Sequence, residues 1–148
     1  MDRILLAVDG SEHAQRAARV AGELSKGLGA SVDVINVVPE RRMVPGDAMV
    51  ARGSLEHVYV SEREILREAG QQVVGQAARI VRDEGGTVGD EAVLMGDAAH
   101  RIAEQAEASK VDCIVLGRRG LGDIGGLFMG SVSHKVANLT HTTLITTG

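Results

Sequence analysis

The stretch RILLAVDGSEHAQRAARVAGELSKGLGASVDVINVV, residues 3–38, decides the fold because it has the pattern of a strand, a helix and a second strand. Residues 3–8 form a short continuous apolar run, which is typical of a strand covered on both faces. The segment DGSE then opens a helix, capped by Asp9 or Ser11, that we expect to run to about Leu28. The closing SVDVINVV is rich in β-branched residues and predicts the second strand. The expected buried stripe of the helix consists of Ala14, Ala17, Ala18, Ala21, Leu24 and Leu28.

The rest of the chain continues this alternation. We expect a mobile surface loop at 39–54, then a helix at 55–84, a strand at 87–95, a helix at 97–109, a strand at 112–117, a helix from Ser131 and a strand at 142–147. The side chains expected to face inward are Leu66, Ala69, Val73, Ala77 and Ile80 in the long helix, and Ala99, Ile102, Ala103 and Ala106 in the next. Strands that alternate with helices imply right-handed crossovers. The pattern therefore predicts an α/β fold with an open parallel sheet and helices on both faces.

Length and composition limit the classes of function. The chain has 148 residues, of which 44% are apolar, so we expect a single globular domain over 1–148. A formal net charge of -4, spread through the chain, offers no basic face for nucleic acid or anionic lipid. The single Cys113 excludes an internal disulfide and is expected to be an inert core residue, and the five histidines show no zinc-ligand spacing.

The apolar run at the N-terminus is short. Its five residues, Ile4 to Val8, are too few for a signal-peptide core or a membrane span. We therefore expect no membrane insertion and a cytoplasmic location.

The segment GRRGLGDIGGLFMGSVSHKV, residues 117–136, is rich in glycine and then becomes helical. It follows a predicted strand, at the end of the sheet where open α/β folds bind ligands. A helix N-terminus offers unpaired N–H groups and the positive end of a dipole, and glycines let an anion approach the backbone. The segment predicts a phosphate site, to which Ser131 and Ser133 could add hydroxyl donors. The alternative is a flexible loop with a glycine hinge.

Two familiar phosphate motifs do not fit this segment. Gly120, Gly122 and Gly125 have the spacing of the dinucleotide fingerprint, but no helix begins at once and no acidic ribose ligand follows. The stretch GGLFMGS, residues 125–131, has the glycine spacing of a P-loop but lacks its lysine. The sequence therefore predicts neither a classical dinucleotide site nor a P-loop NTPase.

The chain resembles the universal stress protein family, specifically its ATP-binding branch, along essentially its whole length. The family motif G-2x-G-9x-G-[S/T] is present as Gly117, Gly120, Gly130 and Ser131, together with AVDGSE, INVVPE and CIVLG. The resemblance implies a Rossmann-like, adenine nucleotide alpha hydrolase-like sheet in strand order 3-2-1-4-5. It also implies ATP, ADP or AMP as ligand, with Mg²⁺ carried by the nucleotide, and a homodimer. The site residues it implies are Ala7, Val8, Asp9, Val37, Leu116, Gly117, Arg119, Gly120, Gly130, Ser131, Val132 and Ser133.

Some of these residues also have a purely structural interpretation. Asp9 could cap the first helix, with Glu12 completing a capping box, and Ser131 could cap the helix that follows the glycines. His134 is expected to be exposed or to cap a helix. Since only Tyr59 and Phe128 are aromatic, an adenine would be packed mainly by aliphatic side chains.

Phosphoryl transfer needs placed carboxylates, a cation and a residue that orients the nucleophile. Asp9 and Asp123 are candidate carboxylates, and the candidate cations are Arg118, Arg119 and Lys135, but no base is identifiable. We therefore expect no catalytic residues and no protein-held metal, and a regulatory protein in which nucleotide biases a conformation or a partner interaction. The alternatives are a slow ATPase or nucleotide-transferring enzyme, and a nucleotide-free scaffold that binds partner proteins through 39–54.

The last strand is expected to form an edge of the sheet. An unpaired edge favours pairing with another chain, and family members commonly pair it about a two-fold axis with a proline and an aliphatic run. Here Thr143 replaces the proline, and Thr146 and Thr147 replace aliphatic residues. We expect a homodimer through 142–147 that is weaker than usual for the family.

Overall fold

The computed structural model of the chain describes the backbone of residues 1–40, 54–121 and 129–148, and their side chains except those of 54–61. The elements are β1 (Arg3–Ala7), α1 (Glu12–Leu28), β2 (Ser31–Val38), α2 (Ser54–Asp83), β3 (Thr87–Met95), α3 (Ala98–Ala108), β4 (Cys113–Gly117), α4 (Ser131–Leu139) and β5 (Thr143–Thr147). The expected positions of these elements are confirmed to within one or two residues. Most of the segment expected as a surface loop at 39–54, together with Gly122, Asp123, Gly125 and Phe128, lies outside the described residues.

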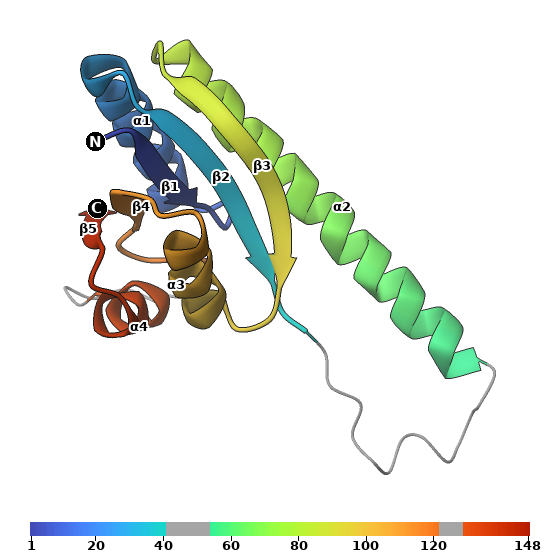
Figure 1. The fold of residues 1–148 in the computed structure, drawn as a ribbon. Helices are drawn as coiled ribbons and strands as arrows, with labels where there is room; N and C mark the ends of the chain where they lie inside the picture. The colour runs from blue at the N-terminus through green and yellow to red at the C-terminus, as the bar shows by residue number, and fades with distance from the viewer. Residues whose placement is uncertain (41–53, 122–128) are drawn as a thin grey trace.

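The five strands form one parallel sheet in the order β3-β2-β1-β4-β5 (Figure 1), which confirms the expected topology. Helices α1 and α2 cover one face, where Leu6 and Val34 lie in a core with alanines of both helices. Helices α3 and α4 cover the other face, where Leu5 and Ile114 pack with Ile102 and Val136. The central strands β1 and β4 are buried on both faces because helices cover both sides of them.

The buried face of α2 differs from the predicted one. Leu66 and Ala69 are exposed, Val73 and Ile80 are only partly buried, and of the predicted stripe only Ala77 is fully buried. The residues that face the sheet are Gly70, Val74, Ala77, Ala78 and Val81. The helix is rotated because its small residues allow a close approach: a Cβ atom on Gly70 would lie 2.7 Å from Asn36 Oδ1 and 2.9 Å from Val93 Cγ1.

The end of α1 also differs from the prediction. Leu28 is exposed and Leu24 is only partly buried, whereas Ser25 is buried. The Ser25 hydroxyl donates to the Ala30 carbonyl at 2.5 Å and accepts from the Thr87 N–H at 2.8 Å. Ser25 is thus buried because it joins the α1–β2 turn to the start of β3. The remaining predicted stripe of α1 is confirmed, as Ala14, Ala17, Ala18 and Ala21 are buried.

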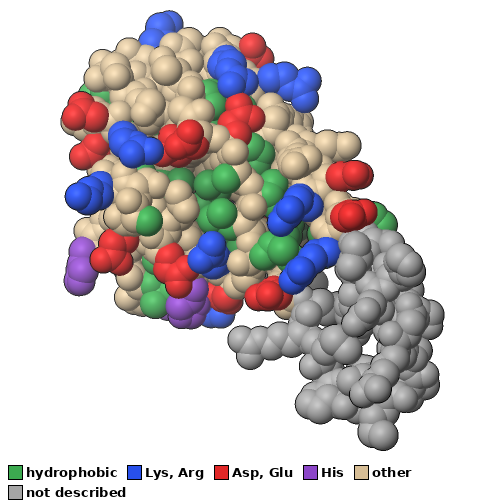
Figure 2. Space-filling model, turned by 45° about the vertical axis from the view of Figure 1, so that its right-hand side comes forward, with side chains coloured by type: hydrophobic (Ala, Val, Ile, Leu, Met, Phe, Trp, Pro, Cys, Tyr) green, Lys and Arg blue, Asp and Glu red, His purple; other side chains and the backbone are tan. Residues whose placement is uncertain are grey.

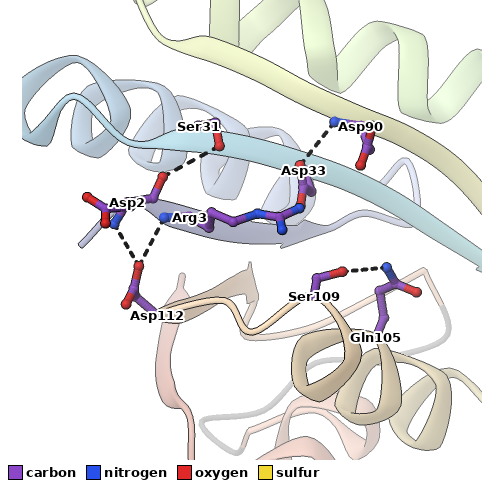
Figure 3. Close-up of polar contacts among 8 residues, drawn as sticks. All are labelled: Asp2, Arg3, Ser31, Asp33, Asp90, Gln105, Ser109 and Asp112. Carbon is purple, nitrogen blue, oxygen red and sulfur yellow. Dashed lines mark hydrogen bonds and ion pairs between the residues drawn. The ribbon is translucent and has the colours of Figure 1, made fainter.

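Polar side chains close the amino ends of the strands (Figure 3). Asp33, which is 4% exposed, accepts from the Arg3 guanidinium at 2.7 Å and from the Asp90 N–H at 3.0 Å. Asp112 accepts from the N–H groups of Asp2 and Arg3 at 2.6 and 3.0 Å. The pKa of Asp112 is lowered by these bonds, that from Arg3 first. The β2–β3 register shifts opposite Asp33, which gives its carboxylate room beside Gly89.

Charges of both signs are interspersed on the face shown in Figure 2, around a central group of hydrophobic side chains. None of the helices in the described ranges has the length and apolar character to cross a bilayer. Cys113 is fully buried, and its pKa is raised first by burial and then by the charge of Asp112. This burial agrees with the core position expected for the single thiol.

Candidate functional site

A cleft of about 140 Å³ lies at the carboxyl ends of β1, β2 and β4. This is the point where the strand order reverses, since β2 lies on one side of β1 and β4 on the other. The lining residues are Ala7, Val8, Asp9, Ala14, Ile35, Val37, Ala98, Ile102, Leu116, Gly117, Arg118, Arg119, Gly120, Gly130, Ser131, Val132 and Ser133. They include every site residue that the sequence resemblance implies.

The end of β1 is fixed by its neighbour β2. The Val8 N–H donates to the Ile35 carbonyl at 2.9 Å, and the Asn36 amide donates to the Val8 carbonyl at 2.7 Å. Val8 is therefore held against β2, and the chain turns at the next residue. This arrangement positions Asp9 at the edge of the cleft.

Asp9 joins the β1–α1 turn to the glycine segment. Its Oδ1 accepts from the Ser11 N–H at 2.9 Å, and its Oδ2 accepts from the Leu121 N–H at 3.1 Å. The helix cap is Ser11, whose hydroxyl accepts from the Ala14 N–H at 3.1 Å. Asp9 is thus not the cap of α1, and the Asp9–Glu12 capping box is wrong, because the helix begins two residues further along than such a box requires.

Two glycines of the motif are explained by contacts within the chain. A Cβ atom on Gly117 would lie 2.8 Å from His13 Cβ and 2.9 Å from the His13 carbonyl carbon, so α1 packs directly on this position. A Cβ atom on Gly120 would lie 2.5 Å from Asp9 Oδ2. At these two positions the missing side chains make room for α1 and for Asp9.

Helix α4 begins at Ser131, and its N-cap is Gly130. Ser131 is therefore the first helical residue rather than the cap, because the Gly130 carbonyl already accepts the first intrahelical bond, from the His134 N–H at 3.0 Å. The Gly130 N–H donates to the Arg118 carbonyl at 2.7 Å. Within the described part of the chain, the N–H groups of Ser131, Val132 and Ser133 have no acceptor, and all three residues line the cleft.

The cleft has an apolar side and an electropositive side. Ile35, Val37, Ile102 and Leu116 supply aliphatic surface. The first turns of α1, α3 and α4 contribute lining residues, so three helix N-termini meet there. Carboxylates stand beside those of α1 and α3, whereas α4 has no side-chain cap. Arg118 and Arg119 line the same cleft. Such a site suits a ligand with an apolar ring and an anionic tail.

Several lining residues were absent from the predicted site. The glycine motif specifies none of Ala14, Ile35, Ala98, Ile102 and Arg118. Three of them, Ala14, Ile35 and Ile102, are buried residues that serve the core equally well. The strand order would have revealed Ala98, because it follows the end of β3 at the carboxyl edge.

The N-cap of α3, Asp97, is hydrogen-bonded to His100 twice. The His100 ring lies 2.7 Å from the Asp97 carboxylate, and the His100 backbone N–H donates to the same carboxylate. The bond to the ring is the first cause of the lowered pKa of Asp97.

The polar side chains of α4 that do not line the cleft are exposed. His134 and Lys135 are on the exposed side of α4, and the exposure of His134 agrees with expectation. Among the described residues, no group of three His, Cys, Asp or Glu side chains could hold a metal ion.

Comparison with known proteins identifies the family. The sequence model of the universal stress protein family matches residues 1–146. A universal stress protein of Thermus aquaticus, encoded in the QAH/OAS sulfhydrylase 3' region, is 36% identical over 136 residues, which are 90% of this chain and 88% of the relative. The structure of UspA from Lactobacillus plantarum has a TM-score of 0.83 at 21% identity, covering 99% of this chain and 97% of the other. A universal stress protein from Archaeoglobus fulgidus in complex with dAMP has a TM-score of 0.66 at 22% identity, covering 100% and 98%. The chain therefore belongs to the universal stress protein family.

Proposed function

We propose that this chain is an ATP-binding regulatory protein of the stress response, in which the bound nucleotide biases a conformation or a partner interaction. The observation that carries the proposal is the meeting, in one cleft at the strand switch point, of aliphatic side chains and N–H groups that have no acceptor among the described residues. The complex of a structural relative with dAMP supports an adenine nucleotide as the ligand class.

Each part of the cleft then has a role. The adenine lies against Val37 and Leu116, and the ribose lies near Asp9, whose carboxylate can accept from a hydroxyl group. The phosphates meet the first N–H groups of α4. The other proposed binding residues are Ala7, Val8, Gly117, Arg119, Gly120, Gly130, Ser131, Val132 and Ser133.

The proposed role is that of a switch rather than of a fast enzyme. The segment lacks the lysine of a P-loop, and neither the sequence nor the described residues identify a group that orients a water. The Mg²⁺ ion would arrive with the nucleotide, whose phosphates hold it. Hydrolysis is therefore expected well below the range of about 1 to 100 per second that is typical of kinases.

The assembly completes the proposal. Residues 1–148 act as one domain, and two chains pair through β5 in the cytoplasm. This strand is an unpaired sheet edge without a charged side chain. The other edge, β3, has Asp90 and Glu91 beside its register shift, features that oppose edge pairing.

Two measurements test the function. Mass spectrometry of small molecules released by denaturing the purified protein is expected to detect ATP, ADP or AMP, and calorimetry is expected to show ATP binding at one site per chain. A phosphate-release assay then separates a switch from an enzyme. Absence of copurifying nucleotide together with no ATP binding at millimolar concentration would favour the scaffold alternative, and fast turnover by pure protein would favour an enzyme.

A further inference from the structure

The hydroxyl of Ser133 is engaged inside the protein. Ser133 is 2% exposed, and its Oγ donates to the Arg118 carbonyl at 2.8 Å and to the Gly130 carbonyl at 3.0 Å. A serine hydroxyl has a single proton, which here lies between two carbonyl acceptors. Its remaining lone pairs would repel an anionic oxygen. The side chain therefore has no donor left for a phosphate while these bonds persist.

Ser131, two residues earlier, is in the opposite state. It lines the same cleft and is exposed, and its hydroxyl has no hydrogen-bond partner in the part of the chain that the structure describes. Its proton is free to be donated to an incoming anion. The two serines of the segment GSVS therefore differ in available chemistry, although both are lining residues.

We infer that Ser133 is a positioning residue that ties the two ends of the glycine segment together, whereas Ser131, already among the proposed binding residues, keeps its hydroxyl for the phosphates. The Arg118 carbonyl accepts from the Gly130 N–H as well as from the Ser133 hydroxyl, so two bonds close the segment at one atom. The part concerning Ser131 rests on the proposed nucleotide function. The part concerning Ser133 rests on these contacts alone.

The same tie reaches the edge strand. The Arg118 N–H donates to the Thr147 carbonyl at 2.7 Å, and the Thr147 hydroxyl donates to the His13 carbonyl at 3.1 Å. The backbone of one residue, Arg118, thus links the start of α4, through its carbonyl, to the end of β5, through its N–H, and Thr147 extends the link to the first turn of α1. Loss of the Ser133 hydroxyl is expected to loosen the end of β5 as well as the glycine segment.

Amide hydrogen exchange of the nucleotide-free protein tests the positioning role. Ser133→Ala is expected to speed exchange of the Gly130 and Arg118 N–H groups on the order of 10-fold, whereas Ser131→Ala leaves both rates unchanged. If Ser133→Ala does not fold, Ser133→Cys keeps the size of the side chain with only a weak donor, and the same increase is expected. Unchanged rates in a folded Ser133 variant would overturn the inference.

Calorimetry with adenosine, AMP and ATP tests the division between the serines. Ser131→Ala is expected to weaken ATP about 10-fold or more and adenosine hardly at all, because its bond is to a charged phosphate. Ser133→Ala is expected to weaken all three ligands by similar factors. The reverse pattern would overturn the inference. If the wild-type protein binds none of the ligands, the proposed function and the Ser131 assignment fail, while the exchange experiment still decides the role of Ser133.

Discussion

The two ends of the sheet use their polar groups differently. At the amino ends, Asp33 and Asp112 accept hydrogen bonds from Arg3 and from backbone N–H groups of neighbouring segments (Figure 3). At the carboxyl ends, small residues leave a cleft, and the first N–H groups of α4 have no acceptor in the ranges described. Both ends belong to the same strands. The polar groups of the amino end thus stabilise the fold, whereas the carboxyl end has donors that we propose bind a ligand.

The carboxyl end of the sheet is not less tightly packed than the amino end. The carboxyl end also contains close contacts, since Asp9 binds the Leu121 N–H and Gly117 packs on α1. These contacts fix the residues around the cleft, whereas the first N–H groups of α4 have no acceptor among the described residues. We therefore expect that some substitutions change ligand binding and others change stability.

The largest expected effect on stability is at Gly117, which lines the cleft and packs against α1. Gly117→Val places a side chain against the backbone of His13, and we expect it to lower the free energy of unfolding by about 3 kcal/mol or more. Gly27→Val is the matched control, because a Cβ atom there meets nothing within 4 Å. Urea denaturation of both variants checks this. If Gly117→Val and Gly27→Val had the same free energy of unfolding, the packing of α1 would not constrain the side chain at position 117.

A smaller loss is expected at the amino end. Asp33→Ala leaves the Asp90 N–H without its acceptor and Arg3 without its ion-pair partner. We expect the free energy of unfolding to fall by about 2 kcal/mol. Nucleotide affinity is expected to stay within about twofold of wild type, because the substitution lies at the far end of the strands. A strong loss of ATP affinity in this folded variant would break the separation of the two ends.

The next expected effect is on dimer formation through β5. Thr143 is the exposed first residue of β5, at the amino end of the sheet, and Thr143→Lys introduces a charge on the proposed pairing edge. Light scattering at micromolar concentration is expected to show a dimer for wild type and a shift toward monomer for the variant. ATP affinity per chain should not change. A wild-type monomer, or a variant that dimerises equally well, would exclude this edge as the interface.

The smallest effect is expected from Asp112 in acid. Hydrogen bonds to its ionised form hold its pKa below the ordinary value of 3.8, so the ionised side chain stabilises the fold. This contribution is complete above about pH 5 and is lost as the pH falls below 3.8 and through the lower pKa of the folded state. Asp112→Asn is expected to flatten the decline of the urea midpoint between about pH 5 and 3. An unchanged slope would contradict this role.

Much of the architecture was predictable because local pattern and crossover handedness constrain it strongly. The apolar run of β1, the cap residues and the alternation of elements gave the α/β class. The strand order came from the family resemblance, since residue patterns alone place no strand beside another across the long connections of this chain. The glycine segment with Ser131 and Ser133 was predicted from the residues themselves, and the other predicted cleft residues came from the resemblance.

The rest depended on contacts between distant residues. In α2 the pairs Val73–Val74 and Ile80–Val81 are all apolar, so periodicity could not decide between two adjacent faces. The fit of Gly70 against Asn36 and Val93 decided it. Likewise, the state of the Ser133 hydroxyl depends on the Arg118 carbonyl, fifteen positions away, which no local pattern reveals.

The most direct test of the account is the affinity of ATP for wild type, Gly130→Val and Gly27→Val, measured by calorimetry on proteins whose folding is checked by circular dichroism. Gly130 has an extended backbone with φ of -63°, which valine also adopts, so the substitution adds no backbone strain. We expect equal ATP affinity for wild type and Gly27→Val, and a loss of about 100-fold or more for Gly130→Val, because the added side chain stands at the start of α4, where the phosphates are proposed to bind. Unchanged ATP affinity in a folded Gly130→Val variant would contradict the assignment of the phosphate site.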